Sequence, residues 1–149
     1  MDKLLNAMKI AFASEFTFYL KSHTFHWNVE GPDFSEFHEL FGNIYEEVLS
    51  AIDPFAENIR KIGAYVPGNF QQMSMIQGAD IDVEVPPAME MTAILLADNE
   101  KLVKMMGLVY KLAEAEGEFG LANFLADRQD AHRKHGWMLR STLKQTGGM

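Results

Sequence analysis

Apolar side chains recur at steps of three and four residues along the stretch between Pro32 and Gly63. On an α-helix this spacing places them all on a single face, which is the pattern of a helix that packs against others. Asp33 or Ser35 can cap the start of this helix, and Gly63 can end it. Pro54 lies in its interior, where it removes a backbone donor, so we expect a bend or a local bulge nearby. The stripe consists of Phe37, Phe41, Ile44, Val48, Ile52, Phe55, Ile59 and Ile62.

Three more stretches carry the same helical periodicity. Because long structureless loops are uncommon in compact domains, we also expect a short helix within the long connection that follows Gly63. No stretch alternates as a strand would, and no segment is repeated. The sequence therefore predicts one all-α domain over 1–149, a four-helix bundle in which the second and third long helices need not be antiparallel neighbours. The expected helices run from Leu5 to the Gly31 turn, from about Phe70 to Gln77 (the short one), from about Ala88 to Gly117, and from about Phe119 to Leu143.

The charge balance and the absence of cysteine exclude several functions. The 149 residues include 13 Lys and Arg against 21 Asp and Glu, a formal charge of −8 that repels nucleic acid and anionic lipid. Without cysteine there are no disulfides, thiolate metal sites or iron–sulfur clusters. The sequence also lacks an apolar run of about 18 residues and a signal peptide. We expect a cytoplasmic protein that makes no membrane contact, in which any metal is bound by His, Asp or Glu.

The chain has five histidines, His23, His26, His38, His132 and His135, and none of them follows a Glu by three residues. The Glu-x-x-His pairs that build a di-iron centre inside a single bundle are therefore absent. His26 and His38 lie on either side of the Gly31-Pro32 turn between the first two helices, so an antiparallel helical hairpin brings their imidazoles to the same level. For His23 we favour a structural or solvent-facing role. For His132 and His135 we favour hydrogen-bonded packing over a secondary metal site.

Two carboxylates on the second helix complete a candidate metal site only if another chain is present. Asp53 and Glu57 are four residues apart and share a helical face. Fifteen positions separate His38 from Asp53, a distance of roughly 22 Å along a helix, so one chain cannot close the site. Two chains packed across a twofold axis would bring His26 and His38 of one to the carboxylates of the other, twice per dimer. Such mixed ligands suit Fe(II), Mn(II) or Zn(II).

The stretch from Lys21 to Gly63 contains the elements His-Trp-Asn-Val, Phe-His-Glu-Leu and Ile-Asp-x-x-Ala-Glu. With these elements and the C-terminal run KHGWMLRSTL, nearly the whole chain resembles the Dps family of ferritin-like mini-cages. The resemblance implies a four-helix subunit with a short helix in the middle connection, assembled as a hollow dodecamer. Such a cage oxidises Fe(II), preferably with hydrogen peroxide rather than oxygen, and stores the ferric mineral inside. The implied iron ligands and catalytic residues are His26 and His38 from one chain and Asp53 and Glu57 from the other.

One position departs from the family pattern. The family usually has Asp or Glu four residues after the second histidine, and this chain has Gly42 there. Glu39 and Glu46 are near in sequence, but neither is a natural substitute on that helical face. We therefore expect a centre that holds iron more weakly, binds one ion rather than two, or recruits water or another carboxylate.

The resemblance implies roles for three further residues. Trp27 follows His26, where the family has an aromatic residue near the iron that can take up oxidising equivalents. Packing at the dimer interface is the alternative explanation for this side chain. In the family, acidic residues at the start of the last helix line a pore on the threefold axis, and the approximate counterparts are Glu118 and Asp127. Their negative potential would concentrate Fe(II), although acidic residues at a helix start also simply favour the helix dipole.

Some family members bind DNA through a Lys-rich tail, but the C-terminal run KQTGGM offers a single Lys. A dodecamer would multiply the subunit charge of −8 by twelve, so we expect poor phosphate binding and protection by chemistry instead. Two alternatives remain. One is a structural or metal-binding cage whose ferroxidase centre is impaired because of Gly42. The other is a helical interaction module in which the His and carboxylate residues are coincidental. Iron uptake separates the first alternative from a ferroxidase, and assembly size tests the second.

Overall fold

The computed structural model describes residues 1–76 and 85–144, and within them it contains helices and no strands. The four predicted long helices are all present, with ends within a few residues of those expected. The short helix predicted in the middle connection is also present, although Gln77, its predicted last residue, lies outside the described residues. The helices are α1 (Asp2–Asn28), α2 (Phe34–Lys61), α3 (Phe70–Ile76), α4 (Ala88–Ala115) and α5 (Phe119–Leu143).

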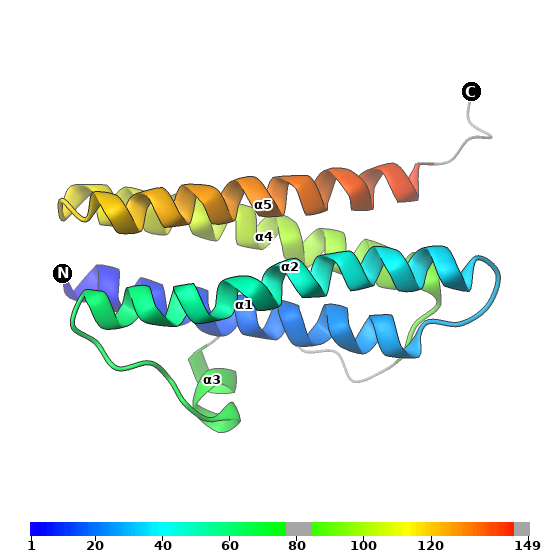
Figure 1. Ribbon diagram of the computed structural model, residues 1–149, viewed down its shortest axis with the longest axis horizontal. Helices are drawn as coiled ribbons and strands as arrows, with labels where there is room; N and C mark the ends of the chain where they lie inside the picture. The colour runs from blue at the N-terminus through cyan, green and yellow to red at the C-terminus, as the bar shows by residue number, and fades with distance from the viewer. Residues whose placement is uncertain (77–84, 145–149) are drawn as a thin grey trace.

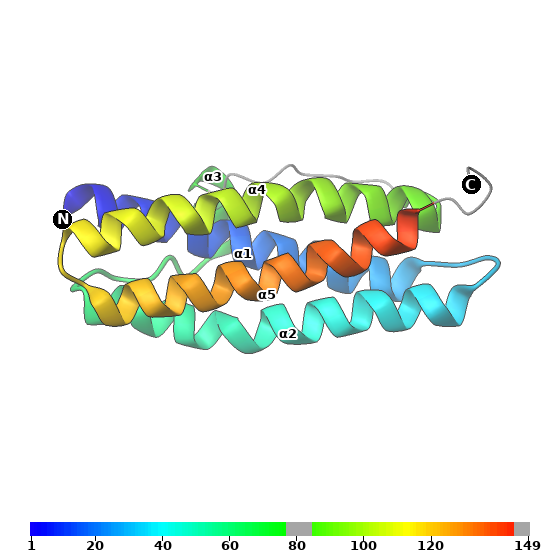
Figure 2. The ribbon, with the colours of Figure 1, turned by 90° about the horizontal axis from the view of Figure 1, so that it is seen from above.

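The long helices form two antiparallel hairpins, α1 with α2 and α4 with α5, that pack side by side (Figures 1 and 2). Helix α1 also packs along α4, and α2 contacts α5. Helix α4 runs in the same direction as α2 (Figure 1). This arrangement agrees with the expectation that the second and third long helices need not be antiparallel neighbours. No described helix is both long and apolar enough to cross a bilayer.

The core is formed by one face of each long helix. Phe55 on α2 illustrates how the faces meet, since its ring lies edge-on to Phe12 of α1 at 6.0 Å and to Phe124 of α5 at 5.3 Å. Each fully buried side chain of this size contributes about 1.5–3 kcal/mol. The stripe predicted on α2 is therefore the face that binds the other helices. The largest fully buried side chains are Phe18, Phe41, Phe55, Leu4, Met8, Ile44, Ile59, Met91, Leu95, Leu102, Met106 and Leu125.

The predicted end of α2 at Gly63 is confirmed, but the predicted side-chain cap at its start is not. Gly63 follows the helix with φ 95° and donates its N–H to the Arg60 carbonyl at 3.0 Å, as a C-terminal glycine should. At the start, Asp33 occupies the cap position, but its side chain makes no capping bond. The reason is its left-handed backbone, φ 63° and ψ 25°, whereas a capping side chain needs an extended one. Ser35 lies inside the helix, so the prediction of a side-chain cap is wrong.

Pro54 does not interrupt α2. The helix is continuous from Phe34 to Lys61 with α-helical turns throughout, so the expected local bulge is absent. Both Pro54 and Ser50, whose carbonyl the proline ring faces, lie on the exposed side of the helix. Water can satisfy the carbonyl that has lost its N–H partner there, so the helix needs no rearrangement.

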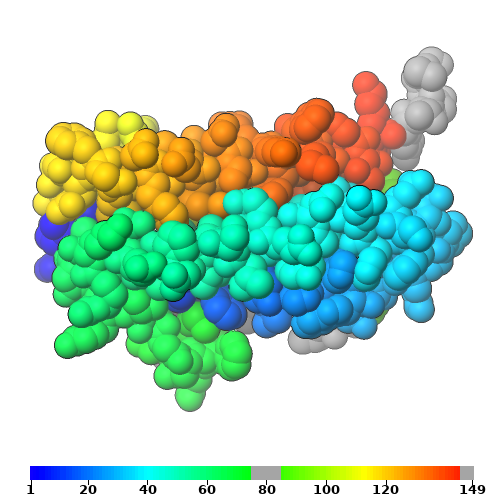
Figure 3. Space-filling model, viewed as in Figure 1, coloured from blue at the N-terminus to red at the C-terminus, as the bar shows by residue number. Residues whose placement is uncertain are grey.

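Helix α3 stands out from the body of the bundle below α1 and α2 (Figure 3). It is attached to α1 through Phe70, whose ring lies edge-on to Phe16 at 6.4 Å, and through the buried Met73. Most of Phe70 nevertheless stays exposed, at 73%. Within a single chain, α3 is therefore only partly covered.

Candidate functional site

His26 near the end of α1 and His38 near the start of α2 lie against each other across the first turn. Their rings are stacked with centroids 3.7 Å apart and planes 17° from parallel. Nδ1 of His26 lies 2.6 Å from the His38 carbonyl oxygen, and Nδ1 of His38 lies 2.7 Å from the His26 carbonyl oxygen. The two residues thus bind each other reciprocally, side chain to main chain, and both rings are only partly buried.

These two hydrogen bonds define the chemistry of the rings. A carbonyl oxygen only accepts, so each Nδ1 must carry the hydrogen that it donates. In the neutral form, each Nε2 therefore keeps a lone pair that can bind a metal. A main-chain carbonyl that orients the other nitrogen is the usual support for a metal-binding histidine. The pair therefore presents two adjacent imidazoles, each held in one tautomer.

Gly42 lies directly beside this pair. A Cβ atom built on Gly42 would come within 3.1 Å of both Cε1 and Nδ1 of the His26 ring. That separation is tighter than ordinary van der Waals contact, so the His26 ring would have to shift by a few tenths of an ångström to admit a side chain at this position. The position that lacks the family's usual carboxylate is therefore also the position against which the His26 ring packs.

Asp53 and Glu57 lie on the exposed face of α2, far from the histidines of the same chain. Because α2 is unbroken, fifteen residues of helix separate His38 from Asp53 by roughly 22 Å. Within residues 1–76 and 85–144, no group of three or more His, Asp or Glu side chains is arranged to hold a metal ion. The structure therefore brings together the two histidines, and separately the two carboxylates, without joining the two halves.

An aromatic cluster lies beside His26, and we name it the Tyr19 cluster: Tyr19, His23, Tyr45 and Trp27. The His23 ring is sandwiched between Tyr45, stacked at 3.7 Å and 6°, and Trp27 at 3.8 Å. The Tyr19 hydroxyl lies 2.9 Å from Nδ1 of His23. Tyr45 also lies 5.1 Å from the His26 ring, so the cluster is in contact with the histidine pair. Trp27 itself is 59% exposed.

The burial of His23 affects its charge. Burial, and then the positive form of the nearby His26, hold the pKa of His23 below its ordinary value. His23 is therefore neutral near pH 7. The sequence prediction gave His23 a structural or solvent-facing role, and the ring packing accounts for the structural part.

A second polar cluster lies inside the bundle, and it contains the other two histidines. Arg128 of α5 donates to Glu15 of α1 at 2.9 Å and to Glu47 of α2 at 2.6 and 3.2 Å. His132 lies 2.6 Å from Glu15, and His135 lies 2.8 Å from Glu47. We call these five residues the Arg128 cluster. The packing role predicted for both histidines is confirmed.

The Arg128 cluster lowers the pKa of both of its carboxylates. Burial would raise the pKa of Glu15, but His132 and then Arg128 outweigh it and hold the pKa below its usual range. Burial also opposes the shift at Glu47, where hydrogen bonds from His135 and Arg128 lower the pKa to about 2. At His135, burial outweighs the carboxylate of Glu47 and lowers the pKa. Both carboxylates are therefore ionised throughout the physiological range.

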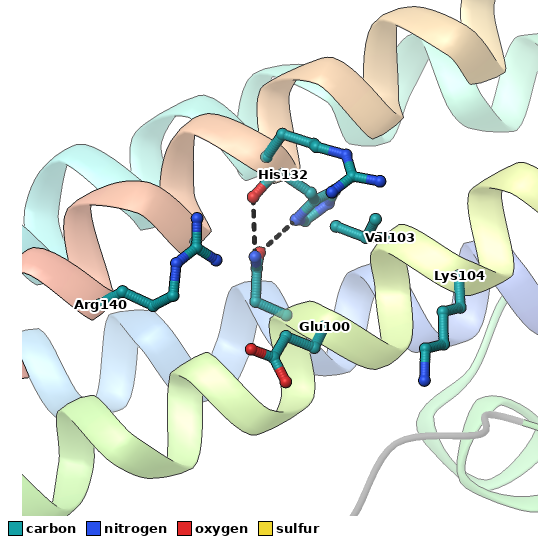
Figure 4. Close-up of a pocket in the computed structure, with 8 residues that line it drawn as sticks. Glu100, Val103, Lys104, His132 and Arg140 are labelled. Atoms are coloured by element: carbon teal, nitrogen blue, oxygen red, sulfur yellow. Dashed lines mark hydrogen bonds between the residues drawn. The ribbon is translucent and has the colours of Figure 1, made fainter.

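His132 is fixed on its other side by Asn99 of α4. The Asn99 amide nitrogen donates to the His132 carbonyl at 2.7 Å, and the amide oxygen lies 2.8 Å from Nδ1 of the ring (Figure 4). The ring borders a pocket of about 260 Å³ between α4 and α5, which Glu100 and Arg140 also line. His132 nevertheless has no exposed surface, so the pocket stops at the edge of the Arg128 cluster.

Both pore candidates lie near the start of α5. Glu118 and Asp127 line one surface hollow of about 440 Å³, together with Pro54, Asn58 and Lys61 of α2. Asn123 lines the same hollow between them. The structure therefore brings the two acids to a single hollow at one end of the bundle, where Lys61 partly offsets their charge.

Sequence reasoning singled out the histidine pair but missed Tyr19, Tyr45 and the partners of Arg128. The spacing of Tyr19, His23 and Trp27, each four residues apart, places them on one helical face and could have indicated the aromatic cluster. No local signal marks Glu15 or Glu47, because their partner is on a helix more than eighty residues away.

Comparison with known proteins agrees with this geometry. The model of the ferritin-like domain family matches residues 5–149. An uncharacterized low temperature-induced protein of Nostoc sp. is 30% identical over 95% of this chain and 80% of the relative. The DNA protection during starvation protein of Brevibacillus brevis is 30% identical, with 85% of each chain covered.

Among solved structures, the chain is similar to the DPS protein from Vibrio cholerae O1. That protein is described as a member of a broad superfamily of ferritin-like diiron-carboxylate proteins. The two are 26% identical, with a TM-score of 0.91 over 96% of this chain and 90% of the other. The bundle with its extra helix, the full-length family match and these relatives together place the chain in the Dps family of ferritin-like proteins.

Proposed function

We propose that this chain is the subunit of an iron-storing cage that oxidises Fe(II) at a site shared between two subunits. Its iron substrate is held by His26 and His38 of one chain and by Asp53 and Glu57 of the other. The oxidant is preferably hydrogen peroxide, and the ferric product is stored inside a dodecamer. Membership of the Dps family and the diiron-carboxylate description of a relative support iron as the substrate.

The observation that carries the proposal is the reciprocal bonding of His26 and His38. Both Nδ1 atoms are used on main-chain carbonyls, which leaves two Nε2 lone pairs next to each other on partly exposed rings. Two imidazoles fill only two coordination positions of Fe(II), which in non-haem sites combines histidine nitrogens with carboxylate oxygens. Asp53 and Glu57 are exposed on one face of α2 and can provide them to a twofold-related chain.

The chemistry balances when two iron ions react with one peroxide. Each Fe(II) loses one electron to become Fe(III), and the two electrons with two protons convert H₂O₂ into two waters. Removing both electrons together avoids release of hydroxyl radical. In this proposal Trp27 lies close enough to His26, through His23, to take up oxidising equivalents. Glu118 and Asp127, which share one hollow, draw Fe(II) toward the interior.

A second candidate is a structural or metal-binding cage with an impaired centre, and Gly42 favours it. The position offers no carboxylate, and the His26 ring packs so closely against it that the ring would have to shift to admit a side chain. In this case the cage assembles, but only one ion is held firmly and paired electron removal fails.

Mixing two inactive variants tests the shared site directly. One variant is His26→Ala, His38→Ala and the other is Asp53→Ala, Glu57→Ala. In a mixed dimer, one site combines both defects and the other combines the intact histidines with the intact carboxylates. Co-assembly by unfolding and refolding together should restore oxidation at roughly a quarter of the sites in a random mixture. Ferric absorbance after addition of Fe(II) and peroxide provides the measurement, on particles sized by chromatography.

The control is each variant refolded alone, which should stay at the rate of iron in buffer. Recovery only in the mixture establishes a site built from two chains. A mixture as inactive as either variant would contradict the shared site, and an inactive wild-type cage of correct size would support the impaired centre.

A further inference from the structure

We propose that Tyr19 is a redox-active residue that delivers the second electron to peroxide, with His23 taking its proton. This inference rests on the proposed ferroxidase function and deepens it. It concerns a side chain that does not bind iron. The observations behind it are the Tyr19–His23 hydrogen bond, the ring stack that links His23 to the iron-binding histidines, and Gly42.

The need for such a donor follows from Gly42. Peroxide takes two electrons, but Gly42 offers no carboxylate and the His26 ring packs against it, so we take the centre to hold one Fe(II) at a time. One Fe(II) gives one electron, and the half-reduced product of peroxide is hydroxyl radical. A protein group close to the iron that supplies the other electron lets the reaction finish without releasing the radical.

The Tyr19 cluster provides a continuous path of rings to such a group. From His26 the path crosses to Tyr45 at 5.1 Å and then to the His23 ring at 3.7 Å. Tyr19 lies beyond, with its ring 5.5 Å from His23 and its hydroxyl hydrogen-bonded to that imidazole. Every step is between neighbouring side chains on α1 and α2.

Within the Tyr19 cluster, Tyr19 is the phenol whose hydroxyl has an imidazole as proton acceptor. A phenol that loses an electron becomes strongly acidic, so its oxidation is favourable only where a base can take the proton. Nδ1 of His23 lies 2.9 Å from the Tyr19 hydroxyl and accepts its hydrogen when the ring carries its own on Nε2. Because the proton stays in the hydrogen bond, it can return and the oxidation is reversible. Tyr19 is also half-buried, whereas Tyr65 is 81% exposed.

The electrons and protons balance in two steps. In the first, Fe(II) becomes Fe(III), the Tyr19 phenol becomes a phenoxyl radical, and its proton moves to His23. The two electrons, with two protons from solvent, convert H₂O₂ into two waters. In the second step another Fe(II) reduces the phenoxyl radical, and His23 returns the proton. The sum is two Fe(II) oxidised per peroxide, although the site holds one at a time.

The experiment loads the assembled cage with one Fe(II) per site, adds peroxide, and freezes samples within milliseconds for electron paramagnetic resonance. We expect a tyrosyl radical in the wild type, identified by the collapse of its hyperfine splitting in protein made with ring-deuterated tyrosine. Tyr19→Phe keeps the ring and its packing, so the subunit should fold, but it should lose most of this signal. A spin trap in the same samples should then report several-fold more hydroxyl radical.

Two variants serve as controls, and a third tests the competing donor. Tyr110→Phe removes a phenol that also has a hydrogen-bond partner, Glu114 at 3.0 Å, but lies on α4 outside the Tyr19 cluster, and it should leave the radical unchanged. Trp27→Phe removes the other residue proposed to take up oxidising equivalents, and the tyrosyl signal should remain because the path from His26 to Tyr19 runs through Tyr45 and His23. His23→Gln keeps an acceptor for the Tyr19 hydroxyl but removes the base, and it should lower the signal although Tyr19 is present.

The outcomes separate this inference from the function on which it rests. A radical of unchanged yield in Tyr19→Phe, or one lost in Trp27→Phe instead, overturns the role of Tyr19. An unchanged signal in His23→Gln overturns the proton transfer to His23. If ferric absorbance in the same wild-type samples never exceeds that of buffer, the ferroxidase function itself fails, and the role of Tyr19 fails with it.

Discussion

Arg128 donates to Glu15 at 2.9 Å at a depth where the Glu15 side chain has no exposed surface. The same nitrogen, Nη2, lies 3.2 Å from Glu47 and 3.3 Å from His132. One guanidinium nitrogen thus lies at the point where two carboxylates and an imidazole converge. This guanidinium provides positive charge to both carboxylates inside the bundle.

Removing this guanidinium should have a large effect on stability. Arg128→Ala leaves Glu15 without its cationic partner, and losing one member of a buried pair costs about 3–5 kcal/mol. We expect a lower midpoint of urea unfolding, and we expect Zn(II) to restore part of it because the freed carboxylates and His132 are suitable zinc ligands. Arg133→Ala is the matched control, an exposed arginine on the same helix. A variant as stable as that control would contradict the role of Arg128.

Because of the Arg128 cluster, we expect the free energy of unfolding to fall as the solution becomes acidic. The pKa of Glu47 is lowered from 4.5 to about 2, so its contribution is complete above 4.5 and is lost as pH falls toward 2. The lowered pKa of His135 acts in a second window, where the unfolded chain takes up a proton below about 6.5 before the folded chain does. Both shifts make the free energy of unfolding rise with pH in their windows.

Urea unfolding measured from pH 2 to pH 7 tests this, and Glu47→Gln should flatten the part of the curve below pH 4.5. Because Glu47 is 37% exposed, solvent screens its interactions and the lost stability should be smaller than the shift alone suggests. Glu90→Gln, an exposed carboxylate on α4, should leave the curve as it is. A Glu47→Gln profile that follows the wild type at every pH would refute the assignment.

Two helical glycines should respond in opposite ways to alanine. Within a helix, Gly→Ala stabilises by about 1 kcal/mol when the new methyl group has room. Gly120 has open space on its side of α5, so Gly120→Ala should gain this amount. At Gly42 the methyl group would meet the His26 ring at 3.1 Å, so Gly42→Ala should gain less and should weaken binding of Co(II), a spectroscopic substitute for Fe(II). Equal gains, with unchanged Co(II) spectra, would show that the His26 ring moves freely.

Binding to DNA should be weak. The subunit carries a formal charge of −8, and assembly multiplies the repulsion from phosphate. In a gel-shift titration with linear duplex DNA we expect no retained DNA at physiological salt. Appending a Lys-rich segment to the C-terminus is the positive control, and it should produce a shift that disappears as salt is raised. Retention by the unmodified cage would mean that a local basic surface outweighs the net charge.

The sequence predicted the elements well because each is specified locally. The stripe from Phe37 to Ile62 and the glycines that follow the helices determine where α2 and α4 lie, and the turn between α1 and α2 brings His26 beside His38. The reciprocal Nδ1 bonds could not be predicted, since they depend on ring orientation rather than on spacing. The same holds for the His26 ring against Gly42, where the sequence indicated a missing ligand but not the side chain that fills its place.

Long-range pairing explains what was missed elsewhere. Glu15 and Arg128 come together only after the two hairpins have packed, and no periodicity relates positions on different hairpins. The predicted cap on α2 failed for a different reason, because the backbone of Asp33 turns left-handed to close the tight turn after α1. Capping propensity is a property of the residue type, whereas the backbone conformation of Asp33 is set by the turn between α1 and α2.

Helix α2 continues without a break through Pro54. It therefore fixes both the distance and the rotation between His38 at one end and Asp53 and Glu57 at the other. In the proposed twofold pairing of two α2 helices, histidines and carboxylates meet in one register only. Inserting a single residue between His38 and Asp53 would turn the carboxylates by about 100° around the helix and lengthen the separation by about 1.5 Å. In the proposed dimer such an insertion would separate the carboxylates from the partner's histidines at both sites, and it would also turn the apolar face of the rest of α2 away from the core.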